Sequence, residues 1–152
     1  MSIKINSKPF GEIEIHEDAV IHFKYGLFGF DDIKKFIVID EQDPESPFKW
    51  LQAIDDPTLA FVIIRPIDFL REYTLSISDS DLMAIDAKSI ENLVVFSIVT
   101  IPADPSLMTA NLQGPVIINP ESMMGCQAIS MNDKYHVRHS ILEEMEKAEA
   151  GE

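Results

Sequence analysis

Short runs of apolar residues, each closed by proline or by a turn, constrain the fold of this chain more than any other feature. Residues 60–64 and 93–101 are almost wholly apolar and rich in β-branched side chains, and Pro66 and Pro102 follow them closely. Runs of this length and composition favour buried strands over helices. Proline has no amide hydrogen and therefore lies at the edges and corners of sheets. The pattern predicts a chain of many short strands.

Other segments add to this set of strands. Residues 11–16 alternate strictly between polar and apolar side chains, which is typical of a strand with one wet face and one buried face. Further strands are expected at residues 19–23, 36–39, 50–54, 108–112, 116–118 and 126–130. The 9 prolines spread among these runs fit a compact barrel built from short strands.

Helices are expected to be few. Short helical turns are predicted at residues 31–35 and 66–73, and a helix at residues 80–85 with Ser78 or Asp79 as its cap. The last helix has the clearest pattern, since four apolar side chains share one of its faces. These are Ile141, Leu142, Met145 and Ala148.

These elements predict a mainly β protein, a small antiparallel β-barrel-like single domain with a few short helices and a C-terminal helix. A chain of 152 residues suits one domain, because domains most often hold ~100–150 residues. We expect the barrel to occupy residues 1–140 and an acidic C-terminal helix and tail to occupy residues 141–152.

The charge balance excludes some classes of partner. The chain has 26 acidic residues against 12 Lys and Arg, a formal net charge of −14. Proteins that bind nucleic acids or anionic membranes need clustered positive charge, so neither is expected as a direct partner. A basic protein partner matches the charge, since opposite fields steer encounter. Plain solubility is the alternative explanation.

A cytoplasmic location is expected. The first six residues lack the apolar segment of a signal peptide, and the longest fully apolar run, residues 59–64, is far shorter than the ~20 residues that span a bilayer. Cys126 is the only cysteine, so no internal disulfide can form. It lies in an expected strand, which indicates a buried structural thiol rather than a nucleophile.

The motifs of catalysis and metal binding are missing or incomplete. His136 and His139 have a spacing that suits a metal on a helix, but no third ligand lies nearby in the sequence. Asp79, Asp81 and Asp86 resemble only part of a calcium loop, and the first two are expected to be acids at a helix start. We expect no metal, no cofactor and no enzyme activity. The alternative is a small-ligand-binding or enzymatic barrel with polar groups in its cavity.

Aromatic and amide side chains in turns are the remaining candidates for function. Five aromatic residues crowd one region: Phe23, Tyr25, Phe28, Phe30 and Phe36. Most are expected in the core, and a few in an exposed apolar patch of the kind that binds proteins. The amides near residues 50–52 and 111–113 could pair with a partner or with the backbone at the barrel's own corners. The acidic residues Asp40, Glu41, Asp43 and Glu45 form either a solvated loop or a partner contact.

Five motifs occur in a fixed order along the chain. They are Gly-Leu-Phe-Gly-Phe at 26–30, Phe-Lys-Trp-Leu-Gln-Ala at 48–53, Leu-Ala-Phe-Val-Ile at 59–63, Thr-Ala-Asn-Leu-Gln-Gly-Pro-Val-Ile-Ile-Asn at 109–119, and Gly-Cys-Gln at 125–127. Together they resemble the FliW family of flagellar assembly factors, with Tyr135 and Arg138 closing the pattern. Ala53 stands where that family usually has Ser, and Cys126 where it often has Arg, which removes a common cation.

The resemblance implies a β-barrel-like fold, no enzyme activity and two protein partners. One partner is flagellin, held before secretion, and the other is CsrA, a small basic RNA-binding dimer that represses translation of flagellin messenger RNA. Binding of CsrA would relieve this repression, and flagellin would compete for the same protein. A purely structural flagellar subunit is a further alternative. Partner contacts are expected at Phe28, Trp50, Gln52, Asn111, Gln113, Asn119, Gln127, Tyr135 and Arg138.

Overall fold

Strands make up most of the regular structure in the computed structural model, which describes residues 2–41, 43 and 45–150. They are β1 (Ser2–Ser7), β2 (Gly11–His16), β3 (Ile21–Phe23), β4 (Lys35–Asp40), β5 (Phe48–Ala53), β6 (Ala60–Ile64), β7 (Val94–Thr100), β8 (Thr109–Ala110), β9 (Val116–Asn119), β10 (Met124–Gln127) and β11 (His139–Ser140). The helices are α1 (Asp79–Ala84) and α2 (Ile141–Ala150), with 3-10 helices η1 (Glu17–Ala19), η2 (Pro66–Asp68) and η3 (Pro105–Leu107).

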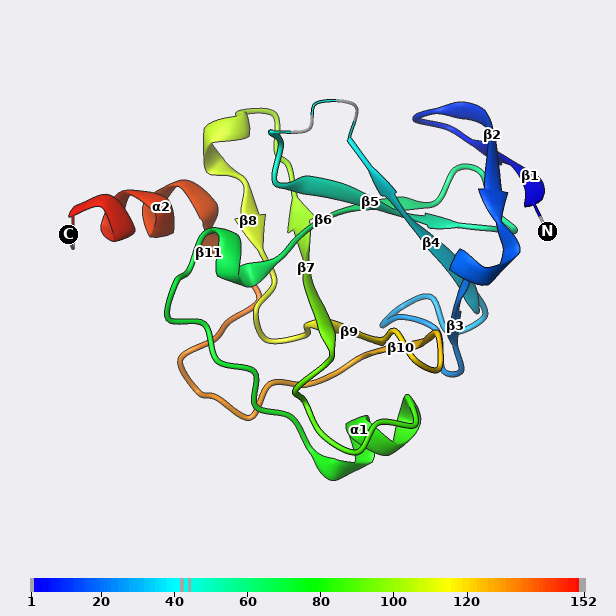
Figure 1. The fold of residues 1–152 in the computed structure, drawn as a ribbon. Helices are drawn as coiled ribbons and strands as arrows, with labels where there is room; N and C mark the ends of the chain where they lie inside the picture. Colours follow the sequence, from blue (N-terminus) through cyan, green and yellow to red (C-terminus); the bar gives the residue numbers. More distant parts are fainter. Residues whose placement is uncertain (1, 42, 44, 151–152) are drawn as a thin grey trace.

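Seven of the strands close into a barrel (Figure 1). The strands β3 to β7 pair antiparallel with their neighbours in sequence, and β10 joins β3 to β9. The ring closes where Val94–Phe96 of β7 pairs with β9. The other end of β7 pairs with β8, which in turn pairs with β11 outside the ring. Closure removes most of the open strand edges that an open sheet would present.

Large apolar side chains fill the barrel. Phe23, Phe36, Leu51 and Ile63 are fully buried, and Phe96 is 3% exposed. The rings of Phe23 and Phe36 meet edge to face with their centroids 5.2 Å apart. Because protein interiors are packed as densely as organic crystals, these side chains make the inside of the barrel a hydrophobic core.

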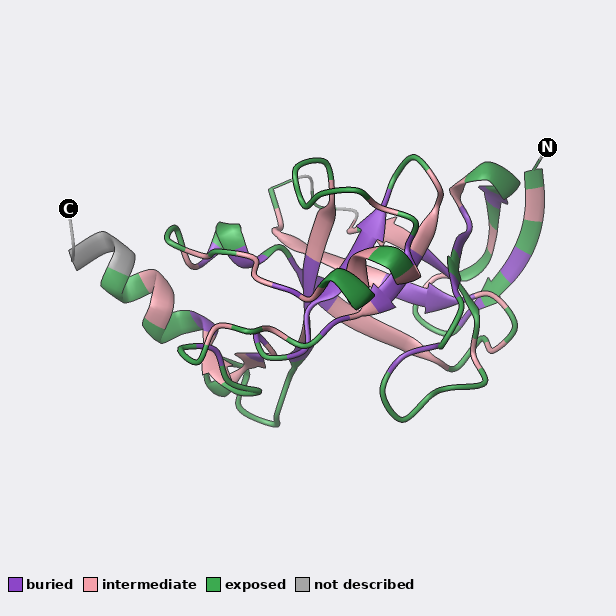
Figure 2. Ribbon diagram, turned by 90° about the horizontal axis from the view of Figure 1, so that it is seen from below, coloured by how far each residue is buried: buried purple, intermediate pink, exposed green. Residues whose placement is uncertain are grey.

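Three further apolar clusters attach the other elements to the outer faces of the strands. The hairpin of β1 and β2 lays Ile5 on Ile37 of β4. The start of α2 is held by Ile141, which is 1% exposed. The segment after α1 is held by Ile85, which packs in one cluster with Cys126. Figure 2 shows the buried segments gathered in the strands and the exposed ones in the helices and loops.

The mainly β barrel is confirmed, and most predicted strands end within about two residues of the observed ones. One strand pair departs from the antiparallel expectation, since β10 runs parallel to β3. The strands β1 and β11 were not predicted. Residues 31–35 form no helix, because Ile33 closes a turn onto the Phe30 carbonyl and Lys35 already begins β4.

Two helix predictions also need correction. Only η2 forms within residues 66–73, and the chain then turns inward so that Phe69 is 2% exposed. In α2, Ile141 faces the core as expected, but Leu142 is 43% exposed. The side chain of Ala148 lies outside the described residues, as do residues 151–152 of the expected tail. The division of the chain at residues 140 and 141 stays a prediction.

Among the described residues, no helix has the length and apolar character needed to cross a membrane.

Candidate protein-binding surface

A tight turn after β3 carries the most exposed aromatic side chains near the predicted site. Leu27 pairs with Phe30 across the turn and is 1% exposed, so it anchors the turn in the barrel. Its neighbours Tyr25 and Phe28 are 62% and 55% exposed. Gly26 has a φ of 66°, in the left-handed region that glycine adopts at little cost. The expectation that most of these five aromatic residues are core is therefore wrong: Phe23 and Phe36 are core, whereas Tyr25, Phe28 and Phe30 are exposed.

An amide clamp holds this turn against a second loop. Gln127 of β10 accepts a hydrogen bond from the backbone N–H of Phe28 through Oε1 and donates from Nε2 to the Gly114 carbonyl, both at 2.9 Å. Asn111 Oδ1 accepts from the N–H groups of Gln113 and Gly114 at 3.0 and 2.9 Å. Four predicted site residues, Phe28, Asn111, Gln113 and Gln127, therefore belong to one neighbourhood.

A groove of about 540 Å³ runs beside this clamp, between the turn and α1. We call it the aromatic groove. Tyr25, Phe28 and Met83 of α1 line it, and Met83 is 78% exposed. The helix is placed by Ser78, whose hydroxyl oxygen caps it by accepting from the Asp81 N–H at 3.2 Å. The sequence prediction missed Met83; its signal was the apolar pair Leu82–Met83 in a helix too short to bury both.

Cys126 lies in the floor of the aromatic groove as a buried thiol. It is 6% exposed, and its Sγ lies 3.8 Å from the Asp81 carbonyl oxygen. Burial first, and the nearby Asp81 carboxylate second, raise the pKa of this thiol to about 12. A thiol with so high a pKa is a poor nucleophile at neutral pH, because the thiolate is the reactive form.

We expect Cys126 in the folded protein to react with a thiol reagent at pH 8 at least ~100-fold more slowly than free cysteine, owing to its raised pKa and burial. Spectrophotometric labelling with an aromatic disulfide measures the rate. The control is the same protein in concentrated urea, where labelling should be fast. Rapid labelling of the folded chain would contradict the structural assignment of this cysteine.

Three predicted site residues are buried and hold the chain's own backbone. Gln52 is fully buried, accepts from the Ser7 hydroxyl at 2.8 Å and donates to the Ala53 carbonyl at 3.0 Å. Asn119 donates from Nδ2 to the Ile85 carbonyl at 3.1 Å. Tyr135 is 7% exposed, and its hydroxyl oxygen accepts from the Thr74 N–H at 2.9 Å. All three side chains face the interior of the free chain, and a contact with a partner stays a prediction for them.

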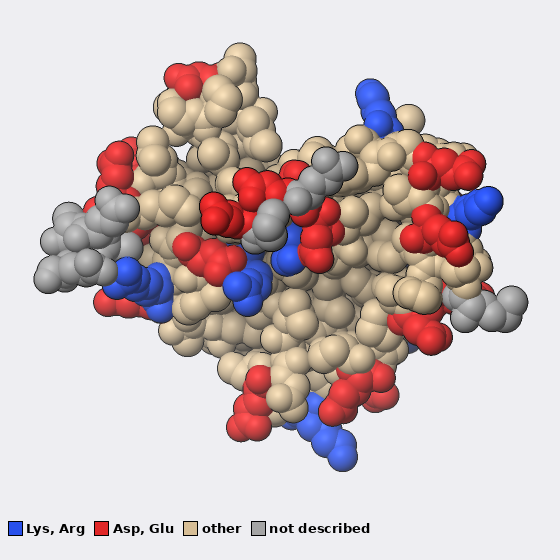
Figure 3. Space-filling view, turned by 45° about the horizontal axis from the view of Figure 1, so that its top comes forward, with Lys and Arg blue, Asp and Glu red and all other residues tan. Residues whose placement is uncertain are grey.

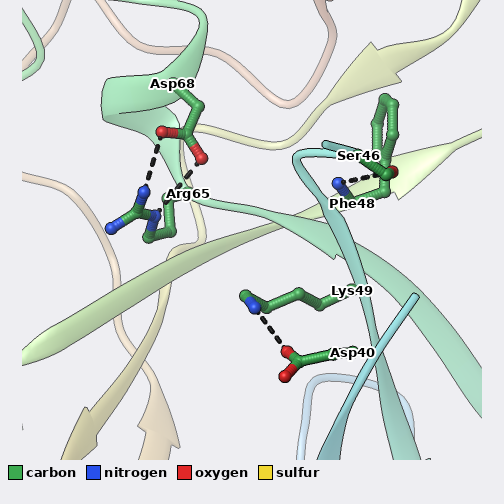
Figure 4. Close-up of polar contacts among 6 residues, drawn as sticks. All are labelled: Asp40, Ser46, Phe48, Lys49, Arg65 and Asp68. Carbon is green, nitrogen blue, oxygen red and sulfur yellow. Dashed lines mark hydrogen bonds and ion pairs between the residues drawn. The ribbon is translucent and has the colours of Figure 1, made fainter. Parts of the chain in front are cut away.

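Trp50 lies on a different face, beside the acidic loop. Its indole N–H donates to Glu41 at 2.7 Å, and its ring meets Phe10 edge to face at 5.8 Å. Asp40, at the end of β4, pairs with Lys49 of the neighbouring strand β5 (Figure 4). Figure 3 shows acidic side chains over this face with only scattered Lys and Arg among them. The surface is therefore negative, although two of the loop's carboxylates are already engaged.

The two C-terminal histidines pair with each other. Their imidazoles stack with an interplanar angle of 9°, and the backbone N–H of His136 donates to His139 Nε2 at 2.7 Å. Burial, and then His136, lower the pKa of His139. The described residues include no group of three or more His, Cys, Asp or Glu side chains that could hold a metal ion. Arg138, between them, is exposed and lies away from the aromatic groove.

The sequence matches known proteins over nearly its full length. The FliW protein family matches residues 4–141. A flagellar assembly factor FliW from Thermoanaerobacter pseudethanolicus is 44% identical over 146 residues, which cover 96% of this chain and 97% of that protein. A protein of the same name from Leptospira interrogans is 45% identical over 144 residues, 94% of this chain and 95% of its own length.

The fold agrees with the sequence. A crystal structure of the flagellar assembly factor FliW matches with a TM-score of 0.83 and 32% sequence identity, covering 91% of this chain and 96% of that one. Similarity in sequence and in fold thus spans the barrel and the loops of the aromatic groove. The chain belongs to the FliW family of flagellar assembly factors.

Proposed function

We propose that this protein is a non-enzymatic, cytoplasmic assembly factor that binds flagellin and the translational repressor CsrA. Binding of CsrA would relieve repression of flagellin messenger RNA, and flagellin would displace CsrA, so that translation follows the pool of unassembled flagellin. The observation that carries a binding function is the aromatic groove. Tyr25, Phe28 and Met83 expose large apolar surfaces around it on an anchored turn and helix.

The anchoring of the groove supports protein binding. Gln127 fixes the backbone of the turn at Phe28, and Leu27 ties the same turn to the core. A preorganised aromatic side chain loses little entropy on binding, which favours affinity. Met83 adds an adaptable contact, since its unbranched side chain can follow the shape of a partner.

The charge of the chain supports a basic partner such as CsrA. A net charge of −14 produces a negative field that speeds encounter with a positive protein. The same field would repel messenger RNA from the complex. Trp50 and the acidic loop, on a face separate from the aromatic groove, are a second candidate contact in this proposal.

The chemistry of the groove supports a role without catalysis. Its thiol is held protonated by the raised pKa of Cys126, and the Gln127 amide is committed to the backbone of the clamp. The alternative, a small-ligand or enzymatic barrel, would require convergent polar groups in a cavity. The barrel interior is instead filled by side chains such as Phe23, Leu51 and Ile63.

Calorimetric titration of the protein with purified CsrA of the same organism tests the proposal, at low and high salt and after preloading with flagellin. We expect CsrA to bind, its affinity to fall at high salt because salt screens charge, and flagellin to abolish binding. A folded chain that binds neither protein would overturn the proposal. Binding of CsrA that does not change with salt would contradict only the claim that charge favours this partner, and would leave the rest of the proposal standing.

The substitution Phe28→Ala tests the aromatic groove. We expect it to weaken binding of at least one partner about tenfold or more, because truncating an exposed aromatic anchor typically costs ~2 kcal/mol or more. Leu107→Ala is the matched control, since Leu107 is 63% exposed on η3 and does not line the groove. Equal affinities of the two variants for both partners would rule out Phe28 as an anchor.

A further inference from the structure

Within the described part of the chain, one edge of β7 has no strand partner beyond Ser97. The pairing of β6 with β7 ends at Ile64 and Ser97. Beyond it the chain leaves β6 for η2 (Figure 1), and Pro66, which would lie opposite Val95 in the continued register, has no amide hydrogen. The Pro66 carbonyl is also engaged, since it accepts from the N–H groups of Phe69 and Leu70. Yet β7 runs on to Val94 and keeps its other edge paired with β9.

The alternation of the ladder shows which backbone groups this edge presents. Ile98 accepts a hydrogen bond from the Asn111 N–H, so its backbone groups point toward the β8 and β9 side. In antiparallel pairing, residues two apart point the same way. Phe96 and Val94 therefore bond toward β9, whereas Ser97 and Val95 point toward β6. Among the described residues no backbone hydrogen bond outside the regular ladders involves Val95.

A groove of about 580 Å³ lies along this open edge. We call it the edge groove. Val95 and Pro66 line it, and two exposed side chains flank it, Ile67 at 50% and Ile90 at 43%. Arg65 on its rim is already paired with Asp68 at 3.1 Å (Figure 4). Glu91, also on the rim, makes no ion pair within the described residues. An apolar groove, with the carboxylate of Glu91 on its rim, therefore runs beside the open edge of β7 at Val95.

A buried hydroxyl on the groove wall also lacks a partner. Tyr73 lines the edge groove, and its hydroxyl is buried without a hydrogen bond in the part of the chain that the structure describes. Its pKa is raised to about 12, first by burial and then by Tyr135. The hydroxyl therefore stays protonated at neutral pH, and Tyr73 adds no charge to the groove wall.

We propose that the edge groove binds an extended segment of a partner protein, which adds a strand to β7 at Val95. The backbone of the segment would exchange hydrogen bonds with the Val95 N–H and carbonyl, as in other cases of strand addition. An apolar side chain would lie between Ile67 and Ile90, and a neighbouring Lys or Arg would face Glu91. The inference rests on the proposed function, since it names the kind of segment that one of the two partners contributes.

Amide hydrogen exchange measured by NMR tests this inference, with purified flagellin and purified CsrA as probes. In the free protein we expect the Val95 amide to exchange faster than those of Phe96 and Ser97, which are bonded in the ladders. On binding of the partner that docks here, exchange at Val95 should slow at least about tenfold. Phe96 and Ser97 serve as internal controls on the same strand.

Ile90→Asp supplies the second measurement, and Leu107→Asp is its matched control because both side chains are exposed. We expect Ile90→Asp to lower the affinity for the docking partner at least about tenfold in calorimetry, and Leu107→Asp to leave this affinity unchanged. If flagellin or CsrA binds, but no protein that binds protects the Val95 amide or loses affinity for the Ile90→Asp variant, the edge groove is not a docking site and the inference is overturned. If neither protein binds the folded wild-type chain, the proposed function itself fails.

Discussion

Replacing Gly26 with alanine is expected to lower the free energy of unfolding by about 3 kcal/mol or more. Gly26 has a φ of 66°, which an L-residue adopts only with strain. An added Cβ would also lie 2.4 Å from the Phe30 carbonyl oxygen and 2.8 Å from the Asp31 Cα. Both are backbone atoms, so no change of rotamer relieves the clash and the turn must open. Urea unfolding followed by circular dichroism measures the loss.

Gly29 provides the control within the same turn. Its φ is 85°, but a Cβ there would meet no atom within 4 Å. Gly29→Ala should therefore lower the free energy of unfolding only by the strain of the left-handed backbone, about 1–2 kcal/mol. Because the turn also carries Phe28, Gly26→Ala should weaken partner binding beyond its effect on stability. Equal losses of stability in the two variants would refute the argument from crowding.

The barrel could be predicted from the sequence because its signals are local. An apolar run predicts each strand, and proline or glycine predicts each corner. The strand predicted at residues 60–64 accordingly has the observed bounds of β6. The closure of β7 on β9 and the parallel pairing of β10 with β3 are not local. They depend on which strands meet after folding, and no pattern of a single segment records that. The edge groove was missed for the same reason.

The candidate site shows the same limit in single residues. Gln52 and Gln127 look alike in the sequence, since each is an amide in an apolar run. Only the fold places Gln52 inside, against the Ser7 hydroxyl, and Gln127 at the rim, against the Phe28 turn. Phe28 and Phe36 are likewise both aromatic, yet one is 55% exposed and the other fully buried. The motifs that resemble the FliW family identified the set of candidates, and three-dimensional position separated them.

Gln52→Leu is the second large effect that we expect, a loss of about 2–4 kcal/mol in the free energy of unfolding. Leucine has a similar volume, so the change removes hydrogen bonds more than packing. The Gln52 amide donates to the carbonyls of Ala53 and Asp56 at 3.0 and 3.2 Å, and accepts from Ser7 at 2.8 Å. Without it these buried groups lose partners, and the β1–β2 hairpin loses its polar link to β5. Urea unfolding at neutral pH measures the loss.

Gln113→Leu is the matched control, because Gln113 is an exposed amide and its substitution should change stability by no more than about 0.5 kcal/mol. Binding measurements on Gln52→Leu also distinguish a structural role of Gln52 from a contact with a partner. If Gln52 only holds the backbone, the folded fraction of Gln52→Leu should bind flagellin and CsrA with wild-type affinity. A Gln52→Leu protein that is as stable as the wild type but binds either partner more weakly would reverse this assignment and return Gln52 to the partner surface.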